Sequence, residues 1–162
     1  NYKLSMPPYI DVVKHVGSDV PFFINKQPAT ISGIGENVVN LNDTQPIKII
    51  IAVPKKGLST KEIFEKYDEM KPKDTEKYSW NDISLFNDLW NTSVEIYPEL
   101  NTIKQNLEDR YNKNFFMSGS GSALFSLFEE NEEIEEIDSK EFNLKYFSIT
   151  KKIDCSFSQN DD

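Results

Sequence analysis

An α+β fold is predicted by this sequence, with a mainly antiparallel sheet and helices packed on one of its faces. Two kinds of apolar pattern lead to that prediction. Short runs rich in branched and aromatic residues are typical of strands, whereas apolar residues three and four positions apart are typical of helices. The strand-like runs are VPFFI, IKIIIAV, FFMSG, LFSLF and LKYFSIT, which begin at residues 20, 47, 115, 124 and 144. By length alone, LFSLF could also be helical.

The composition indicates one ordinary globular domain. The chain has 162 residues, of which 38% are hydrophobic and 12% aromatic. We expect residues 1–150 to form the domain and 151–162 a polar tail, with 1–20 as a candidate tail of a preceding lobe. The net charge of −9 and the absence of a lysine-rich face argue against nucleic acid as a partner.

The single cysteine, Cys155, predicts neither an internal disulfide nor a zinc site. A reducing compartment fits this pattern. Every apolar run is shorter than the roughly 18 residues that span a bilayer, so we expect no membrane partner. The predicted location is the cytoplasm of a bacterium, or a plastid-type organelle if the source is a eukaryote.

The N-terminal third should contain a short helix, a strand and a hairpin. The helix is expected within residues 5–16, ending at Gly17, and the strand VPFFI follows. Turn residues at 26–28 and 33–36 have the spacing of a hairpin. The next strand, IKIIIAV, is almost continuously branched, which predicts cover on both of its faces.

Helices are expected in the middle of the chain. Residues 59–70 begin with a capping-box arrangement, and a polar loop should follow from Pro72 to Tyr78. Leu85, Phe86, Leu89 and Trp90 have helical spacing, as do Leu100, Ile103, Leu107 and Tyr111 behind Pro98. The acidic run 129–142 should be a helix with a solvated face.

Three places could carry chemistry, and each has a plain structural alternative. Asp19 precedes Pro21 at a helix-to-strand transition, where a turn or capping role is as reasonable as catalysis. The SGSGS stretch at 118–122 is either a flexible turn or, if its apolar flanks hold it rigid, a set of backbone amides facing an anion. Phe64 is either a core residue or a ring that contacts a ligand.

Taken in order, several short blocks resemble the C-terminal half of a GHMP-superfamily kinase. The resemblance is to the type that phosphorylates a cytidine diphosphate methylerythritol in non-mevalonate isoprenoid synthesis, and it runs from about Leu4 to about Phe128. The blocks are GSDVPFF, SGIGE, STKEIF, NDLW with YPEL, and MSGSGSALFSLF, beginning at residues 17, 32, 59, 87, 97 and 117. The fold implied is the ferredoxin-like arrangement of GHMP C-terminal domains.

The resemblance implies roles for single residues. Asp19 corresponds to the catalytic base beside the substrate hydroxyl, Phe64 to the ring that stacks on the cytosine, and Thr60 to a neighbour of that base. The residues implied to lie near the nucleotide phosphates are Gly119, Ser120, Gly121 and Ser122. The partners implied are a small-molecule substrate and ATP with Mg²⁺.

The glycine-rich main phosphate loop of the family is not found among these residues. We therefore expect ATP and Mg²⁺ to be bound mainly by a missing N-terminal lobe, with no metal ligand in this chain, and we expect this piece alone to be inactive. Two alternatives stay open. One is the lobe of another small-molecule GHMP kinase, and the other is a non-catalytic binding or interaction module.

Overall fold

The computed structural model describes residues 29–32, 37–40, 47–72, 77–80 and 83–151. The chain divides into two units, one formed by residues 1–45 and 153–162 and the other by 46–152. In the first unit, β1 (Ala29–Ser32) pairs antiparallel with β2 (Asn37–Asn40). This pairing confirms the predicted hairpin around 33–36. The predicted N-terminal helix and the strand VPFFI lie outside the described residues.

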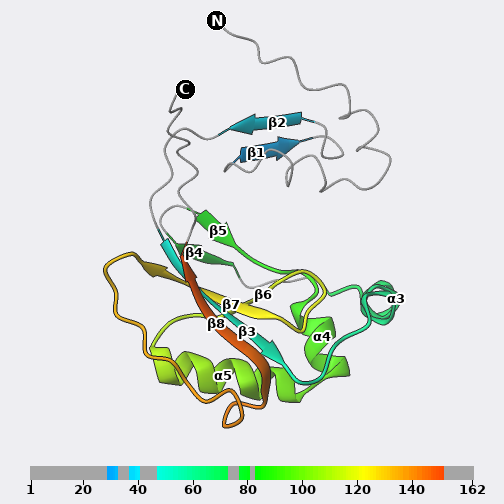
Figure 1. Ribbon diagram of the computed structural model, residues 1–162. Coiled ribbons are helices and arrows are strands. Elements are labelled where there is room, and N and C mark those ends of the chain that lie inside the picture. The colour runs from blue at the N-terminus through cyan, green and yellow to red at the C-terminus, as the bar shows by residue number, and fades with distance from the viewer. Residues whose placement is uncertain (1–28, 33–36, 41–46, 73–76, 81–82, 152–162) are drawn as a thin grey trace, which may run out of the picture. The chain divides into compact units, whose positions relative to one another are not determined.

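The second unit is built on a four-stranded antiparallel sheet in the order β6-β7-β3-β8 (Figure 1). The strands are β3 (Ile47–Pro54), β6 (Phe116–Met117), β7 (Leu124–Glu129) and β8 (Leu144–Lys151). In chain order, the first strand lies between the third and the fourth, as in a ferredoxin-like sheet. Four predicted strands are confirmed, and LFSLF is a strand because it pairs with both β3 and β6.

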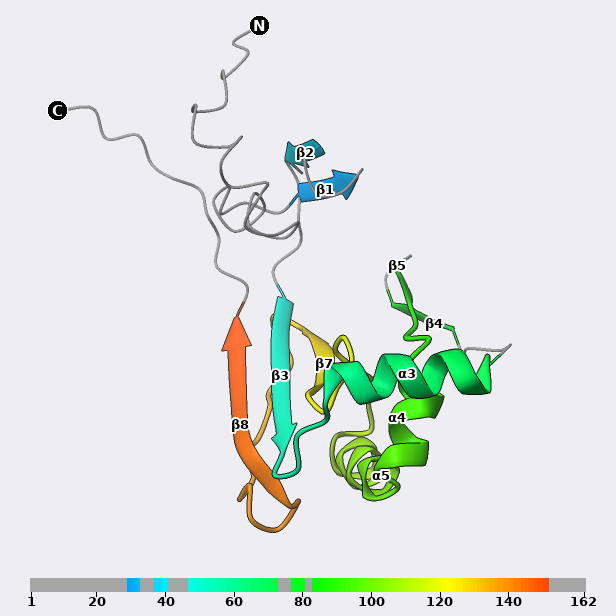
Figure 2. The same cartoon turned by 90° about the vertical axis from the view of Figure 1, so that its right-hand side faces the viewer.

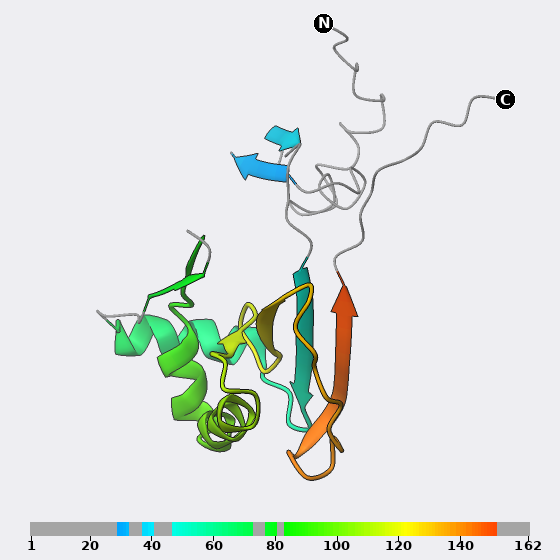
Figure 3. The same ribbon diagram turned by 90° about the vertical axis from the view of Figure 1, so that its left-hand side faces the viewer.

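The helices of this unit cover one face of the sheet, as Figures 2 and 3 show from opposite sides. They are α3 (Thr60–Met70), α4 (Trp90–Ile96) and α5 (Glu99–Tyr111). Between α5 and the sheet, Leu100, Ile103 and Leu107 pack in one core with Ile50 and Leu124. The predicted apolar stripe of α5 and the α+β fold class are therefore confirmed.

Burial along β3 alternates, whereas the sequence predicts a strand covered on both faces. Ile50, Ala52 and Pro54 are buried, whereas Ile49 and Ile51 between them are only half-buried. Successive side chains of a strand point to opposite faces, so the helix-covered face takes every second residue. The branched residues on the other face reflect strand propensity rather than full burial.

Between residue 78 and α4 the chain forms a hairpin and a turn, whereas the helical spacing of Leu85, Phe86, Leu89 and Trp90 predicts a helix. Here β4 (Tyr78–Trp80) pairs antiparallel with β5 (Ile83–Leu85), which places the predicted helical residue Leu85 in a strand. The helix begins at Trp90 because Asn87 forms a turn just ahead of it. Its Oδ1 accepts a hydrogen bond from Leu89 N at 2.9 Å, a local bond that competes with helix formation.

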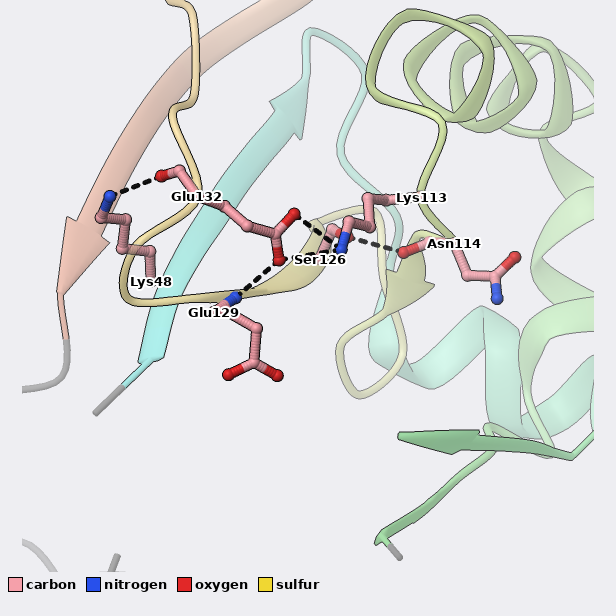
Figure 4. A network of polar contacts seen from close by, with 6 residues as sticks. All are labelled: Lys48, Lys113, Asn114, Ser126, Glu129 and Glu132. Carbon is pink, nitrogen blue, oxygen red and sulfur yellow. Dashed lines mark hydrogen bonds and ion pairs between the residues drawn. The ribbon is translucent and has the colours of Figure 1, made fainter. Parts of the chain in front are cut away.

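The acidic segment 129–142 is not the predicted helix, because no helix is assigned there. Residues 132–138 run without regular structure, and Ile134 and Ile137 lie half-buried against the core. Figure 4 shows why the segment stays in place: the Glu132 carboxylate accepts hydrogen bonds from Lys113 Nζ and Glu129 N, at 2.9 and 2.8 Å. A helix would instead have stacked like charges four residues apart, which is unfavourable.

Candidate functional site

The SGSGS stretch forms a closed turn between β6 and β7. Ser118 N donates to Ala123 O at 2.9 Å, and Gly121 N donates to Ser118 O at 3.0 Å. The turn is framed by Met117 and Leu124, which are paired across the two strands and buried. The apolar residues expected to fix both ends of the loop are therefore buried and paired, as the rigid alternative requires.

Glycine is required at position 121 by both conformation and space. Its φ is +86°, and a Cβ there would lie 2.7 Å from Met117 Sδ and 3.1 Å from Leu58 Cδ1. Gly119 also has a positive φ, +56°, but nothing lies within 4 Å of where its Cβ would be. Gly119 is thus needed for its backbone conformation alone.

Three other segments form hydrogen bonds with this loop. Thr60 Oγ1 at the start of α3 lies 2.9 Å from Ser120 Oγ, within hydrogen-bond distance. Ser93 Oγ of α4 donates to Ser120 O at 3.5 Å. Ser122 Oγ donates to Lys56 O at 2.6 Å, which ties the loop to the segment that follows β3. Figure 2 shows α3 beginning beside this turn.

The first turn of α3 is set by its capping residue. Ser59 is the N-cap, and its side chain accepts a hydrogen bond from Glu62 N at 3.4 Å, which confirms the predicted helix start. Thr60 and Phe64 are four residues apart and therefore neighbours on one face of the helix. The bond between Thr60 and Ser120 thus places Phe64 one helical turn away from the loop.

The Phe64 ring is not a core residue. Its exposed fraction is 51%, whereas its neighbour Ile63 is fully buried. The core alternative for this position is wrong because Ile63, not Phe64, is the buried residue of α3. The ring is left as an exposed aromatic surface beside Thr60.

Asn87 forms hydrogen bonds to the backbone at the start of the loop and was not among the predicted site residues. Its Nδ2 donates to Met117 O at 2.7 Å and to Gly119 O at 2.9 Å. The sequence signal was present, because Asn87 begins the NDLW block. Its contacts across 30 and 32 residues, however, follow from the fold and not from local spacing.

Three amides of the loop remain available. Within the described part of the chain, the backbone N–H groups of Gly119, Ser120 and Ser122 donate no hydrogen bond. The loop carries no acidic side chain, so an anion beside these amides would meet no carboxylate from it.

The nearby Lys56 amine lies 4.6 Å from the centre of the Tyr97 ring. Burial, and then the charge of Glu99, raises the pKa of that Tyr97 hydroxyl.

Asp19 lies outside the described residues, so its predicted role stays a prediction. The described residues contain no group of three or more His, Cys, Asp or Glu side chains that could hold a metal ion. Over the same part of the chain, no helix has the length and apolar character needed to cross a membrane.

Comparison with known proteins agrees with this architecture. Residues 77–140 match the family model described as GHMP kinases C terminal. The crystal structure of 4-(cytidine 5'-diphospho)-2C-methyl-D-erythritol kinase superposes with a TM-score of 0.56 at 20% identity, covering 76% of this chain and 49% of that one. Residues 77–140 are therefore similar to the C-terminal domain of GHMP kinases, and the fold agrees with that similarity.

Sequence relatives make this similarity more specific. The chain is related to proteins named 4-diphosphocytidyl-2-C-methyl-D-erythritol kinase. The relative from Protochlamydia amoebophila is 36% identical over 114 residues, which are 69% of this chain and 40% of that protein. The relative from Clostridioides difficile is 32% identical over 160 residues, 91% of this chain and 54% of that protein. The chain thus spans about half the length of the relatives it matches.

Proposed function

We propose that this chain is the substrate-side lobe of an ATP-dependent kinase that phosphorylates the 2-hydroxyl of 4-diphosphocytidyl-2-C-methyl-D-erythritol in non-mevalonate isoprenoid biosynthesis. The observation that carries the proposal is the contact between Thr60 and Ser120. It joins the helix with the exposed Phe64 ring to the loop with free amides. The names of the sequence relatives support the substrate.

In this proposal, each part of the lobe positions one part of the reaction. The Phe64 ring stacks on the cytosine, an interaction worth about 1 to 3 kcal/mol in nucleic-acid complexes. Thr60 lies beside the base, and Asp19 orients the substrate hydroxyl and accepts its proton. Phosphoryl transfer depends mostly on positioning and charge stabilisation, so these roles suffice for this half of the site.

The Gly119–Ser122 loop suits a place near the phosphates of ATP. Its three free amides and its lack of acidic side chains fit an anion. When bound, ATP with Mg²⁺ supplies the phosphoryl group and neutralises its charge. Because the described residues hold no metal-binding cluster, we predict that an N-terminal lobe binds most of ATP and Mg²⁺. A cytoplasmic location also stays a prediction.

The decisive experiment restores the complete site. The chain is mixed with the separately expressed N-terminal half of the Protochlamydia amoebophila relative, ATP, Mg²⁺ and the proposed substrate, and the phosphorylated product is followed by ³¹P NMR. We expect product only when both halves are present. We expect Asp19→Asn to lower turnover by roughly 10²- to 10⁴-fold, while the matched charge change Asp11→Asn leaves it unchanged.

A substrate panel separates the alternatives. Turnover of homoserine or mevalonate in place of the cytidine compound would assign the lobe to another GHMP kinase. Binding of cytidine nucleotides without turnover in any mixture would favour a non-catalytic module. Phe64→Ala should raise KM about 5- to 150-fold if the ring stacks on the base, whereas Phe64→Tyr should retain a KM near that of the unmodified chain.

A further inference from the structure

A second candidate site lies away from the Phe64 ring. A pocket of about 530 Å³ is lined by residues of β4, of the turn that follows β5, of the start of α4, of α5 and of β6. Its volume is within the range of small-molecule sites. Phe64 and Thr60 are not among its lining residues, so it is distinct from the substrate surface proposed above.

One wall of the pocket is aromatic. The rings of Tyr78, Phe86, Trp90 and Phe116 line it. Tyr78 and Phe116 meet edge to face, with ring centres 5.4 Å apart, and Phe86 is 54% exposed. Such a wall offers flat apolar surfaces and ring edges to a planar ligand.

The polar side of α5 also lines the pocket. Asn101 and Gln105 line the pocket four residues apart, so their amides lie on one helix face. Neither side chain makes a hydrogen bond within the described part of the chain. Each amide offers a donor and an acceptor. Together they suit a ring with a donor and an acceptor along one edge.

The charged residues of the pocket are already paired. Lys104 Nζ lies 2.6 Å from Glu108 Oε1 and 5.6 Å from the centre of the Trp90 ring. Glu108 Oε1 also accepts a hydrogen bond from Phe115 N at 2.9 Å. A phosphate would therefore find no unpaired cation among the lining residues and would meet the carboxylate of Glu108. The ligand should be neutral.

We infer that this pocket binds a neutral nucleoside, with its base against the aromatic wall and the polar edge of the base on the amides of Asn101 and Gln105. The pocket shares Asn87 and Met117 with the SGSGS loop, because Asn87 Nδ2 donates to Met117 O and Gly119 O. Occupation of the pocket is thereby coupled to the loop. An effect of that coupling on phosphoryl transfer rests on the proposed function, whereas the binding of the nucleoside does not.

Fluorescence tests the inference on the whole chain. In a Trp80→Phe background, Trp90 reports on the pocket while adenosine, cytidine, uridine and their 5'-monophosphates are titrated. We expect saturable quenching by at least one nucleoside and weaker binding of its monophosphate. Asn101→Ala with Gln105→Ala should weaken binding about 10-fold or more, because two hydrogen bonds are lost.

Matched variants make the result specific. Asn106→Ala removes an exposed amide of α5 that does not line the pocket, and Phe64→Ala removes the proposed substrate ring; both should leave the affinity unchanged. In ¹⁵N spectra of the unmodified chain, the same nucleoside should shift the amide signals of Gly119 and Gly121. The inference is overturned by absence of saturable quenching, by tighter binding of the monophosphate, or by loss of binding in Phe64→Ala. Phosphoryl transfer is not measured, so this outcome is independent of the kinase test.

Discussion

At the scale of single residues, the loop depends most on Gly121. Its positive φ would cost an ordinary residue about 1 to 2 kcal/mol, and the close approach of Met117 Sδ adds a steric cost. We expect Gly121→Ala to lower the free energy of unfolding the most in a series of three. Gly119→Ala should lose only the conformational part, and Gly57→Ala, with nothing within 4 Å, should change little.

Urea unfolding followed by circular dichroism measures this series. The comparison of Gly119 with Gly121 measures the contacts with Met117 and Leu58, because both glycines have positive φ. Equal losses at the two positions would mean that Met117 moves aside without cost and that packing does not fix the loop.

At the scale of elements, the sequence predicted the helices whose signals are local. The capping serine at 59 and the apolar stripe of α5 gave α3 and α5 because a helix start and a helix face are local patterns. Local spacing could not predict that Tyr78 pairs with Leu85. Nor could it predict the hydrogen bond from Asn87 Nδ2 to Met117 O beside the loop. Exposure of Phe64 was likewise decided by which face of α3 packs against α4.

The acidic segment shows how tertiary partners replace a local preference. Glu132 is bonded by Lys113 and by Glu129 N, and Lys48 Nζ donates to its carbonyl oxygen (Figure 4). Three residues further along, Arg110 pairs with the Glu135 carboxylate and the Tyr111 hydroxyl donates to Glu135 O. Because these partners come from β3 and from the end of α5, the sequence of the segment itself could not reveal them.

This arrangement makes stability depend on pH. The hydrogen bond from Lys113, then that from Glu129 N, lowers the pKa of Glu132 below its usual range. A carboxyl whose pKa is lower in the folded state stabilises the fold above its unfolded pKa, and the contribution is lost as pH falls through the folded pKa. Glu132→Gln should therefore cost up to about 1 kcal/mol at pH 7 and progressively less in acid.

Urea unfolding of this variant at pH 7 and near pH 3 tests that dependence. Glu133→Gln makes the same change of charge at an exposed neighbour and serves as the control. A difference between Glu132→Gln and the unmodified chain that is the same at both pH values would contradict the assignment to Glu132.

At the scale of the whole molecule, all four strands of the described sheet lie within the unit 46–152. The buried core residues run from Ile50 to Leu144, and the pairing of β3 with β7 and β8 is internal to the unit. Within the described part of this unit, the sheet and the helices bury their apolar faces on one another. The proposed function requires that this unit folds by itself. A lobe that forms half of an active site must hold Phe64 and the SGSGS loop in place before the other half binds.

We expect a fragment of residues 46–152 to fold alone. It should unfold cooperatively in urea at a midpoint close to that of the full chain, and its ¹⁵N spectrum should retain the signals of β3, β7 and β8. A fragment that stops at Asn143 is the control, because it lacks β8 and with it Leu144, Phe147 and Ile149 of the core. That shorter piece should not unfold cooperatively, since β3 would lose one of its two neighbours. Failure of 46–152 to fold would mean that residues outside it complete the core, and the loop would then not be formed in advance of its partner.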